Sequence, residues 1–343
     1  MMRAANYRSS AATAAALLLA GCQGPQNILD VAGEQAERIA GLWYFLIAVT
    51  TVVWVLVVLT MFGAIWRRRV RAEPTDIPGE PSPTRGERRL GVVVGSAVVL
   101  TTITLIAFTL DSFFVERRTF AAPPKKALEI QVTGHQWWWQ VRYMDPDPSK
   151  IVETANEIHI PTGRKVKIRL DSPDVIHSFW VPSLHGKRDL IPGQEAIFWI
   201  EADRPGAYRG QCAEFCGWQH AHMSFWVYAE QPQLFDAWLQ QQRQPAPEPQ
   251  GEAAKRGRDL FVTGPCALCH NISGTVASAR FGPDLTHLAS RDWIAAGTLP
   301  NNRGYLAAWI ADPQSLKPGN RMPATFLAPE DMQNLLAYLE TLQ

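Results

Sequence analysis

Residues 210–223, GQCAEFCGWQHAHM, bring thiol, imidazole and thioether groups together within fourteen positions. Cys212 and Cys216 are four residues apart, so a loop can turn both sulfurs inward. Sulfur donors combined with imidazoles are typical of copper electron-transfer sites on a β scaffold. One thiolate serves a single copper ion, whereas two thiolates can bridge a pair. The segment therefore predicts a copper site that needs one further imidazole from elsewhere in the chain.

His177, in the segment DSPDVIHSFWVPS, is the candidate for that imidazole. Its neighbours are apolar, with Phe179 and Trp180 close behind it, which is unusual for a solvent-exposed histidine. A structural zinc site is the alternative, because two cysteines and two histidines suit a closed tetrahedral site. The thioether of Met223 and the apolar surroundings favour copper.

The segment CALCH, residues 266–270, has the pattern by which c-type haem is attached. The thiols of Cys266 and Cys269 would bond to the haem, and His270 would bind its iron. A redox dithiol is one alternative, but that role belongs to a βαβ setting that this region does not predict. Short-range disulfides are another, and one lone cysteine with two closely spaced pairs is a poor disulfide framework.

A sixth iron ligand is expected from a later loop. Met322, in LKPGNRMPATF, lies between Pro and Gly turn residues and is the candidate. Met332 falls within the final helical pattern and is expected in the core, while His287 is a weaker alternative.

Two apolar stretches are long enough to cross a bilayer, which takes about twenty apolar residues. We place these spans at about residues 40–66 and 90–110. An arginine-rich loop between them indicates a cytoplasmic loop, with both chain ends on the outer side of a bacterial plasma membrane. The arginines of this loop are Arg67, Arg68, Arg69, Arg71, Arg85, Arg88 and Arg89.

Residues 1–21 have the charged and apolar regions of an export signal. The signal ends in Leu19-Ala20-Gly21-Cys22, which resembles a bacterial lipoprotein signal in which the cysteine is lipidated. A spare thiol in a discarded peptide is the alternative. Residues 22–118 would then hold the membrane hairpin.

The exported part divides into three segments. Residues 119–240 contain short, β-rich runs separated by Pro and Gly turns, which predict a β-sandwich. In one run Val166, Ile168 and Leu170 alternate with charged residues, as in a half-buried strand. Residues 241–254, rich in Pro and Gln, predict a semi-extended linker. Residues 255–343 have helical spacing and predict a small α-helical domain.

DVIHSFWVPSLHGKRDLIPG followed by GQCAEFCGWQHAHM resembles the binuclear CuA region of cytochrome c oxidase subunit II. The family's pattern is a distant histidine, then Cys-x-Glu-x-Cys-x-x-x-His-x-x-Met, and every position is filled. The resemblance implies that Cys212 and Cys216 bridge two coppers. The other implied ligands are His177 and Met223 on one copper, and His220 and the backbone carbonyl of Glu214 on the other.

Further roles follow only from this resemblance. GHQWWWQVRY matches the family's aromatic stretch, and Trp137 matches the tryptophan of electron entry, although adjacent tryptophans are commonly packing residues. The Glu214 carboxylate would help to hold Mg²⁺ where subunit II meets subunit I. Glu87 stands where the family has a carboxylate near a proton path, or is a solvated partner of nearby arginines. His185 and His222 miss the pattern and are expected outside the ligand set or at the surface.

The C-terminal segment resembles a small cytochrome c. FGPDLTHLA is similar to the segment after the haem motif, which implies a contact of Pro283 with His270. The whole chain thus resembles a caa-type fusion: a multidomain membrane protein with a two-helix transmembrane hairpin, an all-β cupredoxin-like sandwich and an all-α cytochrome c domain.

The resemblance implies a function and partners. Electrons would pass from an external donor, a cytochrome c or a quinol:cytochrome c reductase, to haem c, to CuA and on to subunit I, where oxygen reduction drives proton pumping. The near balance of 33 basic and 32 acidic residues gives no bulk affinity for nucleic acid. Three alternatives are a quinol oxidase subunit II, which lacks copper ligands, a nitrous oxide reductase, which is soluble, and a copper carrier, which needs no haem.

Overall fold

The computed structural model describes residues 24–70, 85–120 and 127–343. The chain divides into two compact units, residues 37–121 and the remainder.

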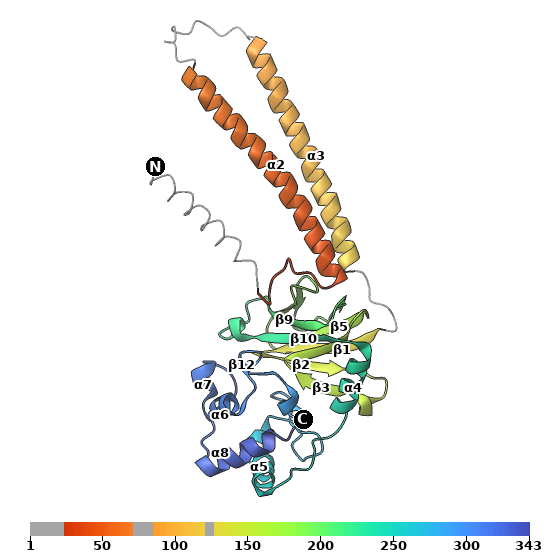
Figure 1. The fold of residues 1–343 in the computed structure, drawn as a ribbon, viewed down its shortest axis with the longest axis vertical. Helices are drawn as coiled ribbons and strands as arrows, with labels where there is room; N and C mark the ends of the chain where they lie inside the picture. The colour runs from red at the N-terminus through yellow and green to blue at the C-terminus, as the bar shows by residue number, and fades with distance from the viewer. Residues whose placement is uncertain (1–23, 71–84, 121–126) are drawn as a thin grey trace, which may run out of the picture. The chain divides into compact units, whose positions relative to one another are not determined.

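The smaller unit is a hairpin of two long helices, α2 (Glu34–Val70) and α3 (Arg85–Thr119), which run side by side (Figure 1). Both are long and apolar enough to cross a membrane, and they contain the predicted spans 40–66 and 90–110. Their large apolar side chains are exposed, as expected of surfaces that lipid covers. Phe45 meets Phe108 edge-on at 5.4 Å, and the Arg38 guanidinium donates to the Arg118 carbonyl at 3.0 Å.

The larger unit contains a sandwich of two five-stranded sheets, as predicted. In the first sheet β1 pairs in parallel with β5 and antiparallel with β2. In the second, β10 pairs in parallel with β4 and antiparallel with β9. The first sheet, in order, is β3 (Val152–Ala155), β2 (Trp138–Tyr143), β1 (Leu128–His135), β5 (Val166–Asp171) and β8 (Ala196–Ile200). The second is β4 (Glu157–Pro161), β10 (Ser224–Glu230), β9 (Gly206–Cys212), β6 (His177–Trp180) and β7 (Arg188–Leu190).

Alternation along the strands places the core between the sheets. In β5 every second residue is buried, and Lys167 and Arg169 on the other face form ion pairs with Glu129 at 2.9 and 3.0 Å. Trp139 is fully buried and meets the rings of Phe179 and Phe225 edge-on. Helix α4 (Pro232–Gln242) follows the last strand and buries Phe235 in the same core. We call residues 127–242 the sandwich domain.

In residues 243–343, the C-terminal domain, helices make up most of the regular secondary structure, and the domain has its own apolar core. Helices α5 and α8 lie against each other (Figure 1), and a side chain at Gly257 would overlap the Asn334 carbonyl. A two-stranded sheet adds to the predicted helices. The elements are α5 (Glu252–Thr263), β11 (Trp293–Ile294), β12 (Leu299–Pro300), α6 (Arg303–Ala311), α7 (Pro313–Leu316) and α8 (Pro329–Leu339). Its short 3₁₀ helices are η4 (Pro265–Leu268) and η5 (Leu288–Ser290), and those of the sandwich domain are η2 (Pro148–Lys150) and η3 (His220–His222).

The segment predicted as a linker is shorter than expected and is held in place. α4 extends to Gln242 and α5 begins at Glu252. Between them, Arg243 pairs with Asp145 at 3.2 Å, and the Ala246 amide donates to the Ser273 carbonyl at 2.9 Å. The segment therefore contacts both domains, which spacing and composition alone do not reveal.

Candidate metal centres

Three strands of the second sheet and the loop between two of them place the predicted copper donors. His177 begins β6 and Cys212 ends β9, and these strands are neighbours. The loop from β9 to β10 carries Cys216, and η3 carries His220. The Cys212 amide donates to the Met223 carbonyl at 2.9 Å, which closes the loop at the start of β10. Residues 46 positions apart in sequence, His177 and Met223, thus reach one end of the sandwich.

The donor atoms lie in one cluster. Cys212 Sγ is 3.8 Å from Cys216 Sγ, 3.8 Å from His177 Nδ1 and 3.2 Å from the Glu214 carbonyl oxygen. Cys216 Sγ is 3.6 Å from His220 Nδ1 and 3.9 Å from Met223 Sδ. Both cysteines, His177 and Met223 are buried. The structure therefore brings together all six donors that the sequence indicated.

The donor set fits a pair of copper ions better than its alternatives. A closed zinc site takes four ligands and would leave the buried Met223 thioether and the Glu214 carbonyl unused. The two thiols are unpaired, as are those of Cys266 and Cys269, so the short-range disulfides are not formed. Two soft thiolates shared by two ions use all six donors.

Asp174, which sequence reasoning missed, orients His177. Its carboxylate oxygen lies 2.9 Å from His177 Nε2, so the other ring nitrogen, Nδ1, faces Cys212. Such carboxylate–histidine pairs fix the ring and raise its basicity. Burial opposes a charge on His177, but the hydrogen bonds to Asp174 and Cys212 outweigh it and raise its pKa. The three-residue spacing between Asp174 and His177 was the available signal, and it is weak.

The two thiols of the cluster have opposite pKa shifts. Cys212 Sγ lies 3.8 Å from Cys216 Sγ, and this contact lowers the pKa of Cys212 to about 4. The pKa of Cys216 is raised in turn, because losing its proton would place a second thiolate beside the first. The site thus holds one thiolate ready, and a bound cation would supply the charge that favours the second.

Two neighbouring side chains meet at the backbone of Cys216. The Trp137 indole N–H and the Gln136 side-chain amide both donate to the Cys216 carbonyl at 2.9 Å. Trp137, predicted as an electron-entry residue, therefore contacts a candidate copper ligand directly. Gln136 was not predicted, because a glutamine between aromatic residues carries no chemical signature.

The remaining residues around the loop take other roles. The Glu214 carboxylate is half-exposed and pairs with Lys187 at 3.4 Å. His222 is exposed, as expected, and its Nδ1 contacts Gln219 at 2.9 Å. His185 lies outside the ligand set but is buried, and its ring meets Phe198 edge-on at 4.9 Å.

The haem-attachment segment is placed at the end of α5. Cys266 lies in η4, and Cys269 caps it. His270 Nδ1 donates to the Pro283 carbonyl at 2.7 Å, which confirms the predicted contact and leaves Nε2 for a metal. Burial lowers the pKa of His270, which favours the neutral imidazole that binds iron. A side chain at Gly282 would collide with the His270 ring, so glycine permits this close approach.

The candidates for the sixth ligand differ in their surroundings. Both ring nitrogens of His287 face backbone carbonyls, those of Gln343 at 2.8 Å and Gln244 at 3.1 Å, which argues against this alternative. Met332 lies in α8, and both Met332 and Met322 pack against the apolar core of this domain. Met322 lies in a loop held by a hydrogen bond of 2.9 Å from the Gln314 side chain to the Met322 carbonyl.

Large apolar side chains next to the haem-attachment residues are exposed. Leu268 lies within CALCH, Phe281 precedes Gly282, and Phe326 follows Met322 by four residues. They are 71, 84 and 96% exposed. Exposed apolar groups of this size mark surfaces that a ligand covers, and a porphyrin is apolar over most of its faces. The C-terminal domain therefore fits haem.

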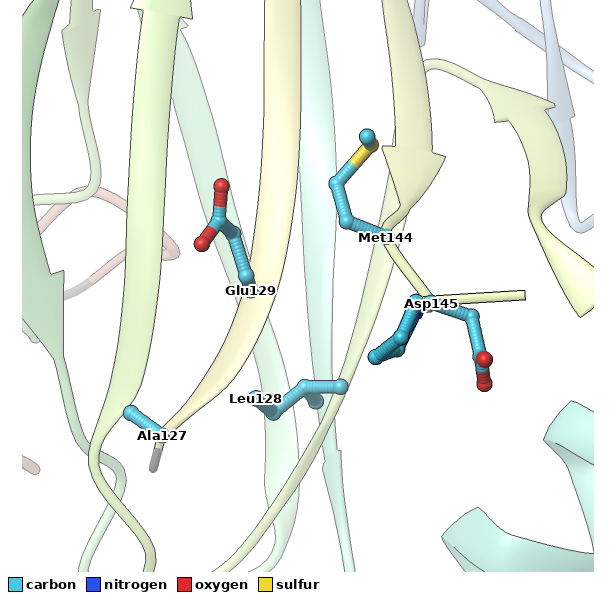
Figure 2. Close-up of a pocket in the computed structure, with 6 residues that line it drawn as sticks. Ala127, Leu128, Glu129, Met144 and Asp145 are labelled. Atoms are coloured by element: carbon cyan, nitrogen blue, oxygen red, sulfur yellow. The ribbon is translucent and has the colours of Figure 1, made fainter. Parts of the chain in front are cut away.

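A surface hollow of about 310 Å³ lies elsewhere, at the ends of β1 and β2 (Figure 2). It contains none of the predicted ligands, and the Glu129 carboxylate on its wall is already paired with Lys167 and Arg169. We assign it no role.

Two predicted residues cannot be placed. Cys22 lies outside the described residues. Glu87 lies in α3, but its side chain is outside the described part of that helix.

Known proteins resemble both domains. The family model for the periplasmic domain of cytochrome c oxidase subunit II matches residues 144–229, and the cytochrome c model matches residues 254–343. The protein named cytochrome c oxidase subunit 2 of Alkalihalophilus pseudofirmus is 36% identical over 332 residues, 95% of this chain and 94% of that one. The protein of that name from Bacillus subtilis is 30% identical over 348 residues, 95% of each chain. The solved periplasmic domain of cytochrome oxidase subunit II of Bradyrhizobium japonicum is 30% identical, covers 35% of this chain and 96% of its own, and has a TM-score of 0.33.

Proposed function

Because this chain belongs to the cytochrome c oxidase subunit II family, in a form with a C-terminal cytochrome c domain, we propose that it carries electrons through two centres of its own to subunit I of a haem-copper oxidase. Cys212, Cys216, His177, His220, Met223 and the Glu214 carbonyl would hold two coppers, and Cys266, Cys269, His270 and Met322 would hold haem c. The observation that carries the proposal is the six-donor cluster around two thiols.

The chain's residues prepare both centres for rapid electron transfer. Bound copper and haem would supply one-electron redox chemistry. Asp174 and the Pro283 carbonyl fix the imidazoles of His177 and His270 before metal arrives, so the ligands move little when the charge changes. Burial of Cys212, Cys216 and Met223 excludes water from the thiolates. Trp137 and Gln136 hold the Cys216 backbone through its carbonyl.

Metal analysis with electron paramagnetic resonance tests this proposal on the full chain, matured with haem and loaded with copper. We expect two coppers per haem and one unpaired electron shared over both coppers. Cys216→Ser should leave at most a localised signal from one copper, because a single thiolate remains. One copper per haem in the unaltered chain would contradict the bridging role, and haem without copper would contradict the copper site.

A separate experiment tests Met322 as the sixth ligand of the haem iron. We expect Met322→Ala to lose the absorbance spectrum of methionine-ligated haem and Met332→Ala to keep it.

The external donor would be a cytochrome c or a quinol:cytochrome c reductase. The haem-attachment segment CALCH and the cytochrome c model matched over residues 254–343 support this. Reduction of the haem by each purified donor, followed by stopped-flow absorbance, identifies the one that reacts. Failure of both would contradict this assignment.

The chain is a membrane protein with a periplasmic domain, and we propose that Cys22 anchors its N-terminus through lipid. The residues Leu19-Ala20-Gly21-Cys22 support this. Mass spectrometry of the mature N-terminus should find a diacylated cysteine. An unmodified residue ahead of Cys22 would contradict the anchor.

Two carboxylates would act only in the assembled oxidase. Glu214 would leave Lys187 and bind Mg²⁺ with ligands from subunit I, so Glu214→Gln should weaken binding of Mn²⁺, a paramagnetic substitute. Glu87 would lie near the entrance of a proton path, and Glu87→Gln should then slow oxidase turnover. Unchanged Mn²⁺ binding or unchanged turnover would remove the respective role.

A further inference from the structure

Lys317 is almost completely buried, with 2% of its surface exposed, where the C-terminal domain meets the sandwich domain. Its Nζ lies 2.9 Å from the His222 carbonyl oxygen and 3.4 Å from that of Trp137, both in the sandwich domain. It lies 3.0 Å from the Ala295 carbonyl oxygen of its own domain. Lysine is almost never buried without partners, and three carbonyls match the three donors of its ammonium group. Lys317 therefore joins the two domains through a specific contact.

A strained turn forms the second part of this contact. Ala295 and Ala296 have φ of 53° and 58°, and Gly297 follows with φ of 70°. Left-handed backbone is unfavourable for residues with a Cβ and persists where the surroundings fix it, often at functional sites. The Ala296 carbonyl accepts hydrogen bonds from the Ser224 amide at 3.1 Å and the Ser224 hydroxyl at 2.9 Å. A side chain at Gly297 would collide with that hydroxyl. The left-handed backbone thus points the Ala296 carbonyl toward Ser224 of the sandwich domain.

The contact brings the two metal-binding loops together. Lys317 begins the loop that leads to Met322, and Arg321, the neighbour of Met322, donates to the Gln136 side-chain oxygen at 2.7 Å. The same Gln136 amide donates to the Cys216 carbonyl at 2.9 Å. A continuous series of bonds and hydrogen bonds therefore runs from the backbone of one candidate ligand to the backbone of the other.

We propose that Lys317 is a positioning residue for electron transfer within this chain. With the turn 295–297 it holds the loop 317–322 on Gln136 and Trp137, and we call these contacts the dock. The inference rests on the proposed function, because it takes Met322 and Cys216 as ligands. Each transfer moves one electron: the haem is oxidised and the copper pair is reduced, with no bond broken and no proton moved.

The test compares Lys317→Met with the unaltered full chain in the assembled oxidase. Methionine has a similar volume but cannot donate to the three carbonyls. The first measurement is hydrogen exchange at the Ser224 amide, whose bond to Ala296 crosses the dock and needs no redox activity. The second is the rate of electron transfer from haem to copper after flash reduction. Lys255→Met, at an exposed lysine of α5, is the matched control.

We expect Lys317→Met to reduce Ser224 protection about tenfold, the effect of one or two lost hydrogen bonds, and to slow the transfer, while Lys255→Met changes neither. Faster exchange at Asn320, whose amide bonds to the Lys317 carbonyl, with unchanged Ser224 would show a role within the loop only and overturn the proposal. Unchanged exchange at Ser224 together with an unchanged rate of electron transfer would also overturn it.

A second variant covers the case in which Lys317→Met fails to fold. Gly297→Ala acts from the other side of the dock and should likewise expose the Ser224 amide and slow the transfer. Haem and copper spectra of each variant report on the two domains separately. An unaltered chain without either spectrum would contradict the proposed function, whereas Ser224 exchange would still test the dock.

Discussion

Two histidines that we propose as metal ligands are held by different means. His177 is fixed through Nε2 by the carboxylate of Asp174, and His270 is fixed through Nδ1 by the carbonyl of Pro283. A carboxylate increases the electron density of the ring more than a carbonyl does, so the two imidazoles are tuned differently as ligands. The Asp174 carboxylate also accepts a hydrogen bond of 2.8 Å from the backbone amide of Gln136. Burial raises the pKa of Asp174, but the hydrogen bonds from His177 and Gln136 outweigh burial and lower this pKa. The Asp174 carboxylate thus fixes both the ring of His177 and the backbone immediately before Trp137.

Asp174→Asn should weaken copper binding about 10–100-fold, because an amide at this position donates or accepts without charge and holds the His177 ring less firmly. Competition with a copper chelator measures the affinity. Asp203→Asn, at an exposed carboxylate, is the control and should bind copper as the unaltered chain does. Equal affinities of all three proteins would show that Asp174 does not support the site.

At the scale of the elements, close approach of α5 and α8 organises the C-terminal domain. Gly257 allows α5 to touch the Asn334 carbonyl, and Phe261 of α5 meets Tyr338 of α8 edge-on at 6.2 Å. α5 leads directly into η4 with Cys266, so the same packing sets the position of the haem-attachment segment.

Gly257→Ala should lower the free energy of unfolding of the C-terminal domain by about 1–3 kcal/mol, because the added methyl group forces the helices apart. Gly304→Ala in α6 is the control: the added methyl group would make only an ordinary contact, at 3.5 Å from Asn302 Oδ1, and alanine should be neutral or stabilise by about 0.5–1 kcal/mol. Thermal unfolding of the full chain, followed by haem absorbance, measures both. A destabilisation that is equal in the two variants would refute the packing explanation.

Sequence patterns predicted secondary structure and donor positions well where the pattern lay within one short segment of the chain. Alternation along residues 166–170 gave β5, and the Cys-x-Glu-x-Cys-x-x-x-His-x-x-Met spacing gave five of the six donor positions in one loop. The contacts of Asp174, Gln136 and Lys317 were not predicted, because they depend on which surfaces meet after folding. Lys317 and Trp137, for example, are 180 residues apart. The haem domain's placement on the sandwich follows from such contacts and was left open by the sequence.

At the scale of the whole molecule, the larger unit combines two domains that could have been separate proteins. Stacking of Trp226 on Trp293, at 5.6 Å, and the bond of 2.9 Å between Tyr228 and Asp292 extend the contact beyond Lys317. Joining them in one chain replaces a diffusional encounter with an intramolecular one.

The anchored segment between α4 and α5 has a consequence for supply. It joins the two metal-binding domains in one chain, so both are made as a single translation product in a ratio of one to one. The amounts of the two domains in the cell therefore cannot vary independently of each other.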